Sequence, residues 1–309
     1  MSSSIHVNDS IQVINATTWL IGQNILLSRQ ATPHPNPGQA SWSDGSGAYF
    51  VLSDVPPPPG PSPQSQPHPP DSPNLPRVYA AGDQSAVWCA GEAFIKIQNL
   101  TDPEATREHV TLEFLEGKKP LDFKIPTVLY HGEWDGRYYL IASRVPGKTL
   151  SEAWPTMGEE LRRYYVHRVS DLCEKMAEWE GKQISGVDGG QLTELYLRKD
   201  KSLVPDILRE NCIGIGMDVS SLVFYHCDLG PGNILVEPDD NRGMGIIDWD
   251  VAGYVPREWI RTKFHLSSGL DFPDIEGPEK SDWRRLVSKR LAAMGFKEVI
   301  EGWLAFPST

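Results

Sequence analysis

A proline-rich stretch from residue 56 to residue 76 limits most strongly how this chain can fold. It holds eleven of the 26 prolines, interleaved with Gly, Ser, Gln and His. Proline fixes φ and lacks a backbone N–H, so this composition favours extended polyproline conformations over a packed core. We therefore predict a flexible segment over residues 56–76, at the end of an N-terminal extension that spans residues 1–77.

The proline-rich segment also suggests a partner. It contains P-x-x-P spacing, which SH3-like domains bind in the polyproline conformation. A non-enzymatic interaction protein, recruited by an SH3-like partner through this segment, is therefore one function that stays open. Earlier in the extension, the apolar runs at residues 11–14 and 49–52 could each form a strand or pack on the main body.

The charge balance argues against several classes of partner. The chain has 41 Asp and Glu against 29 Lys and Arg, a formal net charge of -12, so we expect no nucleic acid and no membrane surface as a partner. The most apolar early stretch, residues 19–27, is shorter than the roughly 18 apolar residues of a membrane helix. Because the four cysteines are scattered without zinc-ligand spacing, we expect a reduced, cytoplasmic protein.

Short apolar runs separated by turn residues follow Arg77. The runs at residues 78–80, 86–89 and 93–97 predict an antiparallel meander, and residues 138–142 predict a further strand. In the third run Phe94 and Lys96 alternate with Ile95 and Ile97, so Lys96 lies on the face opposite the two isoleucines.

A helix is predicted next, with Thr101 or Asp102 as its N-cap. Its apolar stripe includes Glu108 beside leucines. A buried carboxylate requires a cationic partner or a metal ion, and Lys96 is the obvious candidate. Glu104, on nearly the same stripe, is the alternative to Glu108. Further helices are expected over residues 159–180 and around residues 283–291.

The residues that indicate chemistry lie between residues 222 and 250. Three short apolar runs, at residues 222–225, 234–236 and 245–247, each end in a polar turn. Asp228 and Asn233 lie in the first of these turns, and Asp248 follows the third run. A hairpin between the last two runs would bring Asn233 and Asp248 to the same edge, where their oxygens form a polar corner.

This set of residues matches the requirements of phosphoryl transfer. Magnesium prefers oxygen ligands, such as an Asn carbonyl and an Asp carboxylate. A separate carboxylate receives the proton of the acceptor hydroxyl, and a lysine held by a glutamate neutralises the α/β-phosphates. The chain offers one residue for each of these roles, in the order Lys96, Glu108, Asp228, Asn233 and Asp248.

The motif His226-x-Asp228-x4-Asn233, followed by Ile247-Asp248-Trp249, resembles the aminoglycoside phosphotransferase and choline kinase branch of the protein-kinase-like fold, and more narrowly the fungal proteins with that domain. The resemblance covers roughly residues 78–270. It implies a two-lobed α+β fold, with a small antiparallel β-rich N-lobe over residues 78–143 and a larger, mainly helical C-lobe over residues 144–309.

The resemblance also implies cofactors and roles. ATP and Mg2+ would be the cofactors, Lys96 would bind the α/β-phosphates, and Glu108 would pair with Lys96. Asp228 would be the catalytic base, while Asn233 and Asp248 would hold magnesium. Residues 82–85 resemble a phosphate-covering turn, which makes Ser85 a candidate nucleotide contact, although a plain hairpin turn is the alternative.

Two departures from protein kinases favour a small-molecule hydroxyl acceptor. Cys227 stands where kinases switched by activation-loop phosphorylation have an arginine, and no A-P-E motif follows Asp248. A protein kinase and a catalytically weak, pseudokinase-like binding module stay open as alternatives. We expect His226 to hold the loop by hydrogen bonds, with a general-base role as the alternative, and Cys227 to be an apolar filler rather than a redox-sensitive thiol.

An acidic run follows the predicted metal site. In the aminoglycoside-modifying relatives, acidic residues of this region receive the amines of the substrate, which implies the same role here. The alternative is a solvated acidic loop. The run comprises Asp271, Asp274, Glu276 and Glu279.

Overall fold

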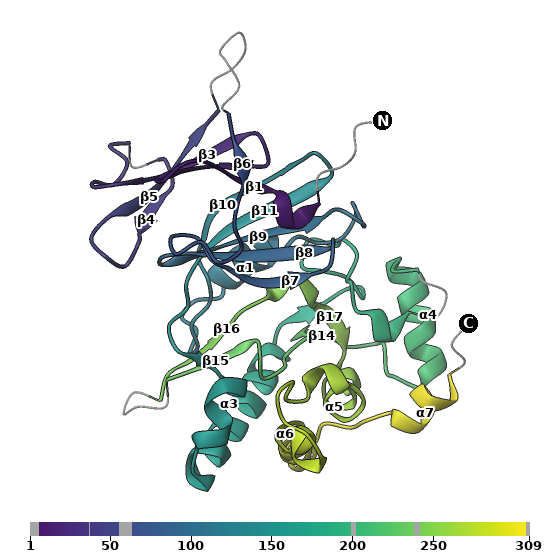
Figure 1. Cartoon of the computed structure of the whole chain (residues 1–309). Helices are drawn as coiled ribbons and strands as arrows, with labels where there is room; N and C mark the ends of the chain where they lie inside the picture. The colour runs from purple at the N-terminus through teal and green to yellow at the C-terminus, as the bar shows by residue number, and fades with distance from the viewer. Residues whose placement is uncertain (1–5, 37, 56–63, 199–201, 238–241, 307–309) are drawn as a thin grey trace. The chain divides into compact units, whose positions relative to one another are not determined.

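The computed structural model describes residues 6–36, 38–55, 64–198, 202–237 and 242–306. The chain divides into two compact units (Figure 1). The first unit comprises Met1–Pro103 and Pro126–Arg144, and the second comprises Glu104–Ile125 and Val145–Thr309.

A five-stranded antiparallel sheet forms one layer of the first unit, in the order β10-β11-β9-β8-β7. The predicted meander is confirmed, because β7, β8 and β9 pair in sequence. Along β9, Ile95 and Ile97 are fully buried, whereas Lys96 lies on the opposite face and is only partly buried, as the alternation predicts. The strands are β7 (Arg77–Ala81), β8 (Ser85–Ala90), β9 (Ala93–Asn99), β10 (Val128–Trp134) and β11 (Arg137–Ser143).

The N-terminal residues build a second sheet of six strands, in the order β4-β5-β3-β2-β1-β6 (Figure 1). One hydrophobic cluster joins the two sheets: it includes Trp19 and Phe50 from the six-stranded sheet and Trp88 and Ile95 from the five-stranded sheet. The described residues before β7 are thus an integral part of the first unit. The strands are β1 (Ile11–Asn15), β2 (Thr18–Ile21), β3 (Ile25–Gln30), β4 (Ser41–Ser43), β5 (Tyr49–Asp54) and β6 (Gln66–Pro67).

The second half of the proline-rich segment is built into this unit. Residues 56–63 lie outside the described residues. Gln66 and Pro67 pair with β1, and Leu75 is fully buried in the core. Within the segment for which composition predicts flexibility, Gln66 and Pro67 thus have backbone partners in the N-terminal sheet, and Leu75 has an apolar surface to pack on.

The second unit is mainly helical and contains two small antiparallel sheets, ordered β12-β15-β16 and β13-β14-β17. Its helices are α1 (Glu108–Glu116), α2 (Leu150–Ala153), α3 (Glu159–Met176), α4 (Pro205–Ile215), α5 (Arg257–Leu266), α6 (Asp282–Ala293) and α7 (Ile300–Ala305). Its strands are β12 (Lys148–Thr149), β13 (Glu180–Gly181), β14 (Leu222–His226), β15 (Ile234–Val236), β16 (Met244–Ile246) and β17 (Ala252–Pro256).

Helix α1 begins later than the sequence predicts. Its first residue is Glu108, and its N-cap, Arg107, makes no side-chain capping bond. The residues before it pair with Gln191 instead: Thr106 N–H donates to Gln191 O at 3.1 Å, and Gln191 N–H donates to Glu104 O at 2.9 Å. This distant backbone partner competes with helix formation over residues 101–107, so the predicted caps at Thr101 and Asp102 are wrong.

The other expected helices are present, although α3 ends at Met176 rather than near residue 180. In the part of the chain that the structure describes, no helix has the length and apolar character needed to cross a lipid bilayer.

Candidate active site

The site in the second unit begins where β14 ends. All five residues of β14 are buried, and the loop that follows carries Asp228. His226 Nε2 lies 3.1 Å from Ile247 O, and Asp228 N–H donates to His226 Nδ1 at 3.2 Å. Since one backbone partner is an acceptor and the other a donor, the ring is the neutral Nε2–H tautomer. His226 therefore holds the loop, as predicted, by bridging it to the residue before Asp248.

Burial keeps this histidine neutral. The ring is fully buried and lies 4.7 Å from the Trp249 ring. Removal from water lowers the pKa of His226 below its ordinary value of 6.5, with the Ile247 carbonyl and nearby acids acting in the opposite direction. A general-base role would require access to a reacting group, and the complete burial of the ring argues against that alternative.

Asp228 and Asn233 are bonded to each other. The Asn233 side-chain amide donates to Asp228 Oδ2 at 3.0 Å and to Asp228 O at 2.8 Å. Inside the loop, Asn233 N–H donates to Gly230 O at 3.0 Å, which forms a tight turn. The amide nitrogen is thus committed to Asp228, so the direction of the amide is fixed and its oxygen is the atom that a metal ion could use.

The environment of Asp228 makes it a stronger base than an exposed aspartate. Burial raises the pKa of Asp228 to about 6, and the negative charges of Asp248 and Asp250 act in the same direction. Lys263 and the Asn233 amide lower the pKa of Asp228, but by less. A carboxylate with a pKa near 6 is ionised at neutral pH and accepts a proton more readily than an ordinary aspartate.

The hairpin predicted from the apolar runs is present. Strands β15 and β16 pair with Ile234 opposite Ile246, and Ile247 N–H donates to Asn233 O at 3.0 Å. Asn233 and Asp248 therefore lie at the same end of this hairpin. Asp248 adopts φ +65° and ψ 58°, a left-handed conformation that costs free energy in a residue other than glycine. Backbone strain of this kind is concentrated at functional sites.

Glu108 belongs to the same corner. Its Oε1 accepts a hydrogen bond from Trp249 N–H at 3.1 Å, and the side chain is 4 % exposed. The carboxylates of Glu108, Asp248 and Asp250 lie within 4.8 Å of one another. Asp250 was not a candidate from the sequence. It follows Asp248 by two residues, and the short 3-10 helix η4 (Trp249–Val251) brings both acids back together.

This donor set fits a magnesium ion. Mg2+ prefers carboxylate and amide oxygens and usually retains several waters. Here, carboxylate oxygens gather beside the hairpin end that carries the Asn233 amide oxygen. Carboxylates this close repel one another, and a bound divalent cation would relieve that repulsion.

The remaining candidates lie in the first unit, on one face of its five-stranded sheet. Ser85 is the first residue of β8 and is opposite Gln98 on β9, while Lys96 is opposite Val87. Because side chains alternate along each strand, Ser85 and Lys96 share the face that points away from the core cluster.

A buried ion pair near the Asp228 loop was not foreseen. Lys263 donates to Glu194 Oε1 at 2.9 Å and to Oε2 at 2.7 Å, and the two side chains are 5 % and 1 % exposed. Glu194 raises the pKa of the Cys227 thiol and Lys263 lowers it. Lys263 also lowers the pKa of Asp228. The two residues are far apart in the sequence, so no local pattern connects them.

Two expectations about neighbouring residues are resolved by burial. Cys227 is fully buried, and burial holds the pKa of its thiol well above the ordinary value, which fits an apolar filler. Asp271, from the acidic run, is 8 % exposed and accepts a hydrogen bond from Arg284 Nε. Asp271 is thus committed to an internal ion pair, which argues against a role in receiving an acceptor amine.

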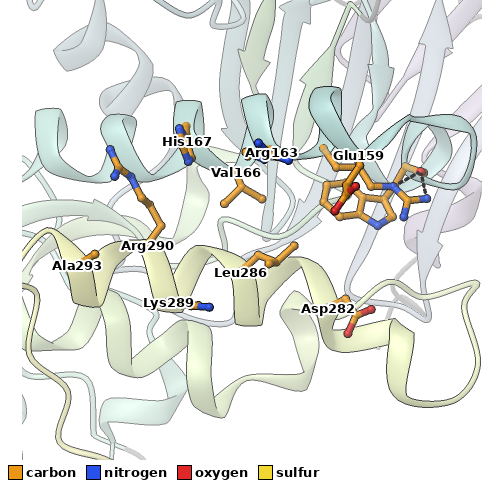
Figure 2. A pocket seen from close by; sticks show the side chains of 11 residues that line it. Glu159, Arg163, Val166, His167, Asp282, Leu286, Lys289, Arg290 and Ala293 are labelled. Carbon is orange, nitrogen blue, oxygen red and sulfur yellow. Dashed lines mark hydrogen bonds between the residues drawn. The ribbon is translucent and has the colours of Figure 1, made fainter.

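A separate groove lies between α3 and α6 in the second unit (Figure 2). Its volume is about 420 Å3, and its lining includes Val166, His167, Leu286 and Arg290. None of the candidate site residues lines this groove.

Comparisons with known proteins place the chain in a family. The family model of the phosphotransferase enzyme family (APH) matches residues 69–259. A search of curated proteins gave no match.

Solved structures with similarity to this chain include aminoglycoside phosphotransferases. APH(3'')-Id from Streptomyces rimosus ATCC10970 is 17% identical, with a TM-score of 0.47 over 75% of this chain and 91% of that chain. Aminoglycoside-3'-phosphotransferase of type VIII is 18% identical, with a TM-score of 0.45 over 76% of this chain and 92% of that chain. APH(2")-IIa, in a complex with streptomycin and ATP, is 17% identical, with a TM-score of 0.44 over 71% of this chain and 76% of that chain.

The family match and the two units confirm the predicted fold class, a protein-kinase-like α+β fold with a β-rich N-terminal part and a mainly helical C-terminal part. Because residues 69–259 are more than half of the 309 residues, the chain belongs to the phosphotransferase enzyme family.

Proposed function

We propose that this protein transfers the γ-phosphate of ATP, bound with Mg2+, to a hydroxyl group of a small molecule. The observation that carries the proposal is the bonded pair of Asp228 and Asn233, at one end of the hairpin that leads to Asp248. This pair supplies a base of raised pKa beside an oxygen-rich corner, and these are two of the parts that hydroxyl phosphorylation requires.

Asp228 is the proposed catalytic base. Its carboxylate would orient the acceptor hydroxyl and take its proton as the oxygen attacks the γ-phosphorus. The bond from the Asn233 amide to Oδ2 fixes the carboxylate, which leaves Oδ1 for the acceptor. A neutral His226 fixes the backbone of the loop, so the base is positioned before substrate arrives.

Asn233 and Asp248 are the proposed magnesium ligands. Asp250 is proposed as a further ligand because its carboxylate lies within 4.8 Å of that of Asp248. When bound, the ion would neutralise charge on the β- and γ-phosphates. Glu108 accepts a hydrogen bond from the backbone N–H of Trp249, and this bond connects α1 to the start of η4. We retain the expected pairing of Glu108 with Lys96 as part of the proposal.

Lys96 is proposed to bind the α/β-phosphates, and Ser85 is proposed as a nucleotide contact on the same sheet face. A small-molecule acceptor is favoured over a protein because position 227 is a buried cysteine. A kinase regulated by activation-loop phosphorylation needs an arginine there to bind the phosphate group.

Thermal unfolding with Mg-ATP tests the nucleotide site. A ligand that binds only the folded state stabilises it, by about 2.7 kcal/mol when its concentration is a hundred times Kd. The midpoint temperature of unfolding rises as a result. We expect a shift in the wild type that is largely lost in Asp248→Ala and Asp250→Asn. The exposed Asp206, in the first turn of α4, provides a matched control as Asp206→Ala. A wild type that does not respond to millimolar Mg-ATP would contradict the proposal.

The acceptor class needs its own experiment. Small hydroxylated compounds, including aminoglycosides, choline-like amines, sugars and nucleosides, would be incubated with the enzyme and Mg-ATP, and phosphorylated products would be detected by mass spectrometry. A generic protein substrate serves as the comparison. Phosphate incorporated into the protein, with none in any small molecule, would support the protein kinase alternative.

A further inference from the structure

The turn between β7 and β8 lies directly before Ser85, on the sheet that carries Lys96. Gln84 N–H donates to Ala81 O at 3.0 Å and closes the turn. Gly82 adopts φ +55°, a conformation that is available to glycine without strain. The residue after Gly82 is Asp83, whose side chain is a point at which this turn can be held from outside the sheet.

The N-terminal segment holds Asp83 through its side chain. The 3-10 helix η1 (Val7–Asp9) packs on β8 and β9, and Val7 N–H donates to Asp83 Oδ1 at 2.7 Å. His6 Nδ1 is 3.5 Å from the same oxygen, but this nitrogen accepts from Asn8 N–H at 3.1 Å, so Val7 supplies the hydrogen bond. The matched family region begins at residue 69 and does not include this segment.

The donor in this contact is itself rigidly placed. The Val7 side chain is fully buried in the core cluster, together with Ile11. Ser10 is 3 % exposed, and its hydroxyl accepts from Arg137 Nη1 at 2.7 Å. The Val7 N–H is therefore fixed between a buried apolar anchor and a buried hydrogen bond to β11.

The turn is also held from the opposite side. The Asn99 side-chain amide donates to the backbone carbonyl of Asp83, and Asn99 N–H donates to Gln84 O at 2.9 Å. These two bonds tie the turn to the end of β9. The bond from Val7 adds a restraint that comes from outside the sheet.

We propose that Asp83 is a positioning residue for the nucleotide, and that through it the N-terminal segment holds the β7–β8 turn in its binding conformation. This inference rests on the proposed function, in which Ser85, at the end of this turn, contacts the nucleotide. A turn that is ordered beforehand loses less conformational entropy when the nucleotide binds. Loss of the restraint should weaken ATP binding and leave the transfer step unchanged.

Charge and hydrogen bonding predict opposite effects at this position, which makes the proposal testable. Asp83 is negative, so its removal should favour a polyanionic nucleotide if charge alone matters. Its oxygen accepts from Val7, so its removal should weaken nucleotide binding if the turn must be held. Asp83→Ala removes both the charge and the acceptor, whereas Asp83→Asn removes the charge but retains an acceptor oxygen.

The experiment compares these two variants with the wild type and with Asp71→Ala, which removes another exposed aspartate of the first unit. Hydrogen exchange of the amides of residues 79–87 is measured without nucleotide, and the Kd for Mg-ATP and the basal rate of ATP hydrolysis at saturating ATP are measured separately. For Asp83→Ala we expect exchange and Kd to increase by about five- to tenfold, with the saturated rate within about twofold. Asp83→Asn and Asp71→Ala should remain within about twofold of the wild type.

The outcomes separate this inference from the proposed function. Unchanged exchange in Asp83→Ala, or a lower Kd for Mg-ATP, overturns the positioning role. Equal losses in Asp83→Asn and Asp83→Ala overturn the assignment to the Val7 hydrogen bond. A wild type that binds no Mg-ATP overturns the proposed function and the role in nucleotide affinity together, while the exchange comparison still reports whether the hydrogen bond orders the turn.

Discussion

Asn233 directs its side-chain amide nitrogen to Asp228, at 3.0 Å from Oδ2 and 2.8 Å from the carbonyl oxygen of the same residue. A side chain that spans five residues in this way fixes the loop and the carboxylate together. The amide oxygen is left for a metal ion, so a single residue connects the proposed base with the proposed magnesium site.

Replacing the proposed base should affect turnover rather than nucleotide binding. In Asp228→Asn the Asn233 amide retains an oxygen to donate to, so the loop geometry is preserved. Loss of the proton acceptor should lower turnover at least about 10²-fold, while the Kd for Mg-ATP changes by no more than a few-fold. Steady-state kinetics with an identified acceptor, together with thermal titration of Mg-ATP, measure the two quantities. Equal turnover in the variant would contradict the assigned role.

The same substitution should stabilise the metal-free protein above pH 6. The pKa of Asp228 is raised to about 6 in the folded state, so folding opposes ionisation of this carboxyl. The folded wild type therefore binds more protons than the unfolded chain between about pH 4 and pH 6, and its stability falls as pH rises through this window. Asp228→Asn has no carboxyl to ionise at this position, so its stability does not fall for this reason as pH rises.

The gain of Asp228→Asn over wild type should consequently grow between pH 4 and pH 7.5, by up to about 3 kcal/mol. Urea unfolding of both proteins in EDTA at the two pH values measures this difference. A difference that does not change with pH would show that Asp228 is not destabilised by burial and by its acidic neighbours.

Local patterns predicted the hairpin that positions Asn233 and Asp248, because two short apolar runs around a polar turn have one simple pairing. They did not predict the start of α1, since the backbone of Glu104 and Thr106 pairs with Gln191, a residue far along the chain. Asp250 was missed for a different reason. The sequence pattern around Asp248 does not indicate the 3-10 helix that places the Asp250 carboxylate beside that of Asp248.

The N-terminal sheet shows the same limit on a larger scale. Apolar runs indicated two of its strands, but the partner surface for those strands is the five-stranded sheet formed later in the chain. Proline content predicts flexibility for residues 56–76, and nothing in that composition indicates that Leu75 is fully buried in the shared core. Composition describes what a segment does alone and cannot include an apolar surface supplied from elsewhere.

His226 should make the protein less stable in acid. Burial lowers the pKa of His226 in the folded state, so the unfolded chain binds more protons and stability falls as pH drops below about 6.5. Protonation would also place a hydrogen on Nδ1, which accepts from Asp228 N–H. His226→Gln, which retains a donor for the Ile247 carbonyl, removes this titration.

The advantage of wild type over His226→Gln in unfolding free energy should therefore shrink between pH 7.5 and pH 5. Urea unfolding at the two values checks this, and the other histidines cancel because both proteins contain them. An advantage that grows in acid would mean that the folded state favours the protonated ring.

The buried ion pair of Glu194 and Lys263 should behave as a unit. Glu194→Leu leaves the Lys263 ammonium 5 % exposed without its two carboxylate contacts, and the cost expected for an uncompensated buried charge is about 3–5 kcal/mol. Lys263 also lies 4.2 Å from the Tyr196 ring, which cannot replace a full negative charge.

Replacing both partners should recover most of that loss. In the double variant Glu194→Leu with Lys263→Met, two apolar side chains fill the site and no charge remains buried, so its stability should exceed that of either single variant. Urea unfolding of all four proteins gives the coupling free energy. Additive losses in the double variant would show that the two charges do not stabilise each other, and would leave packing and the bonds that Glu194 accepts from Tyr196 N–H and Trp259 Nε1–H as the contributions. Strong coupling would establish that Glu194 and Lys263 act as a pair, whose lysine also lowers the raised pKa of Asp228.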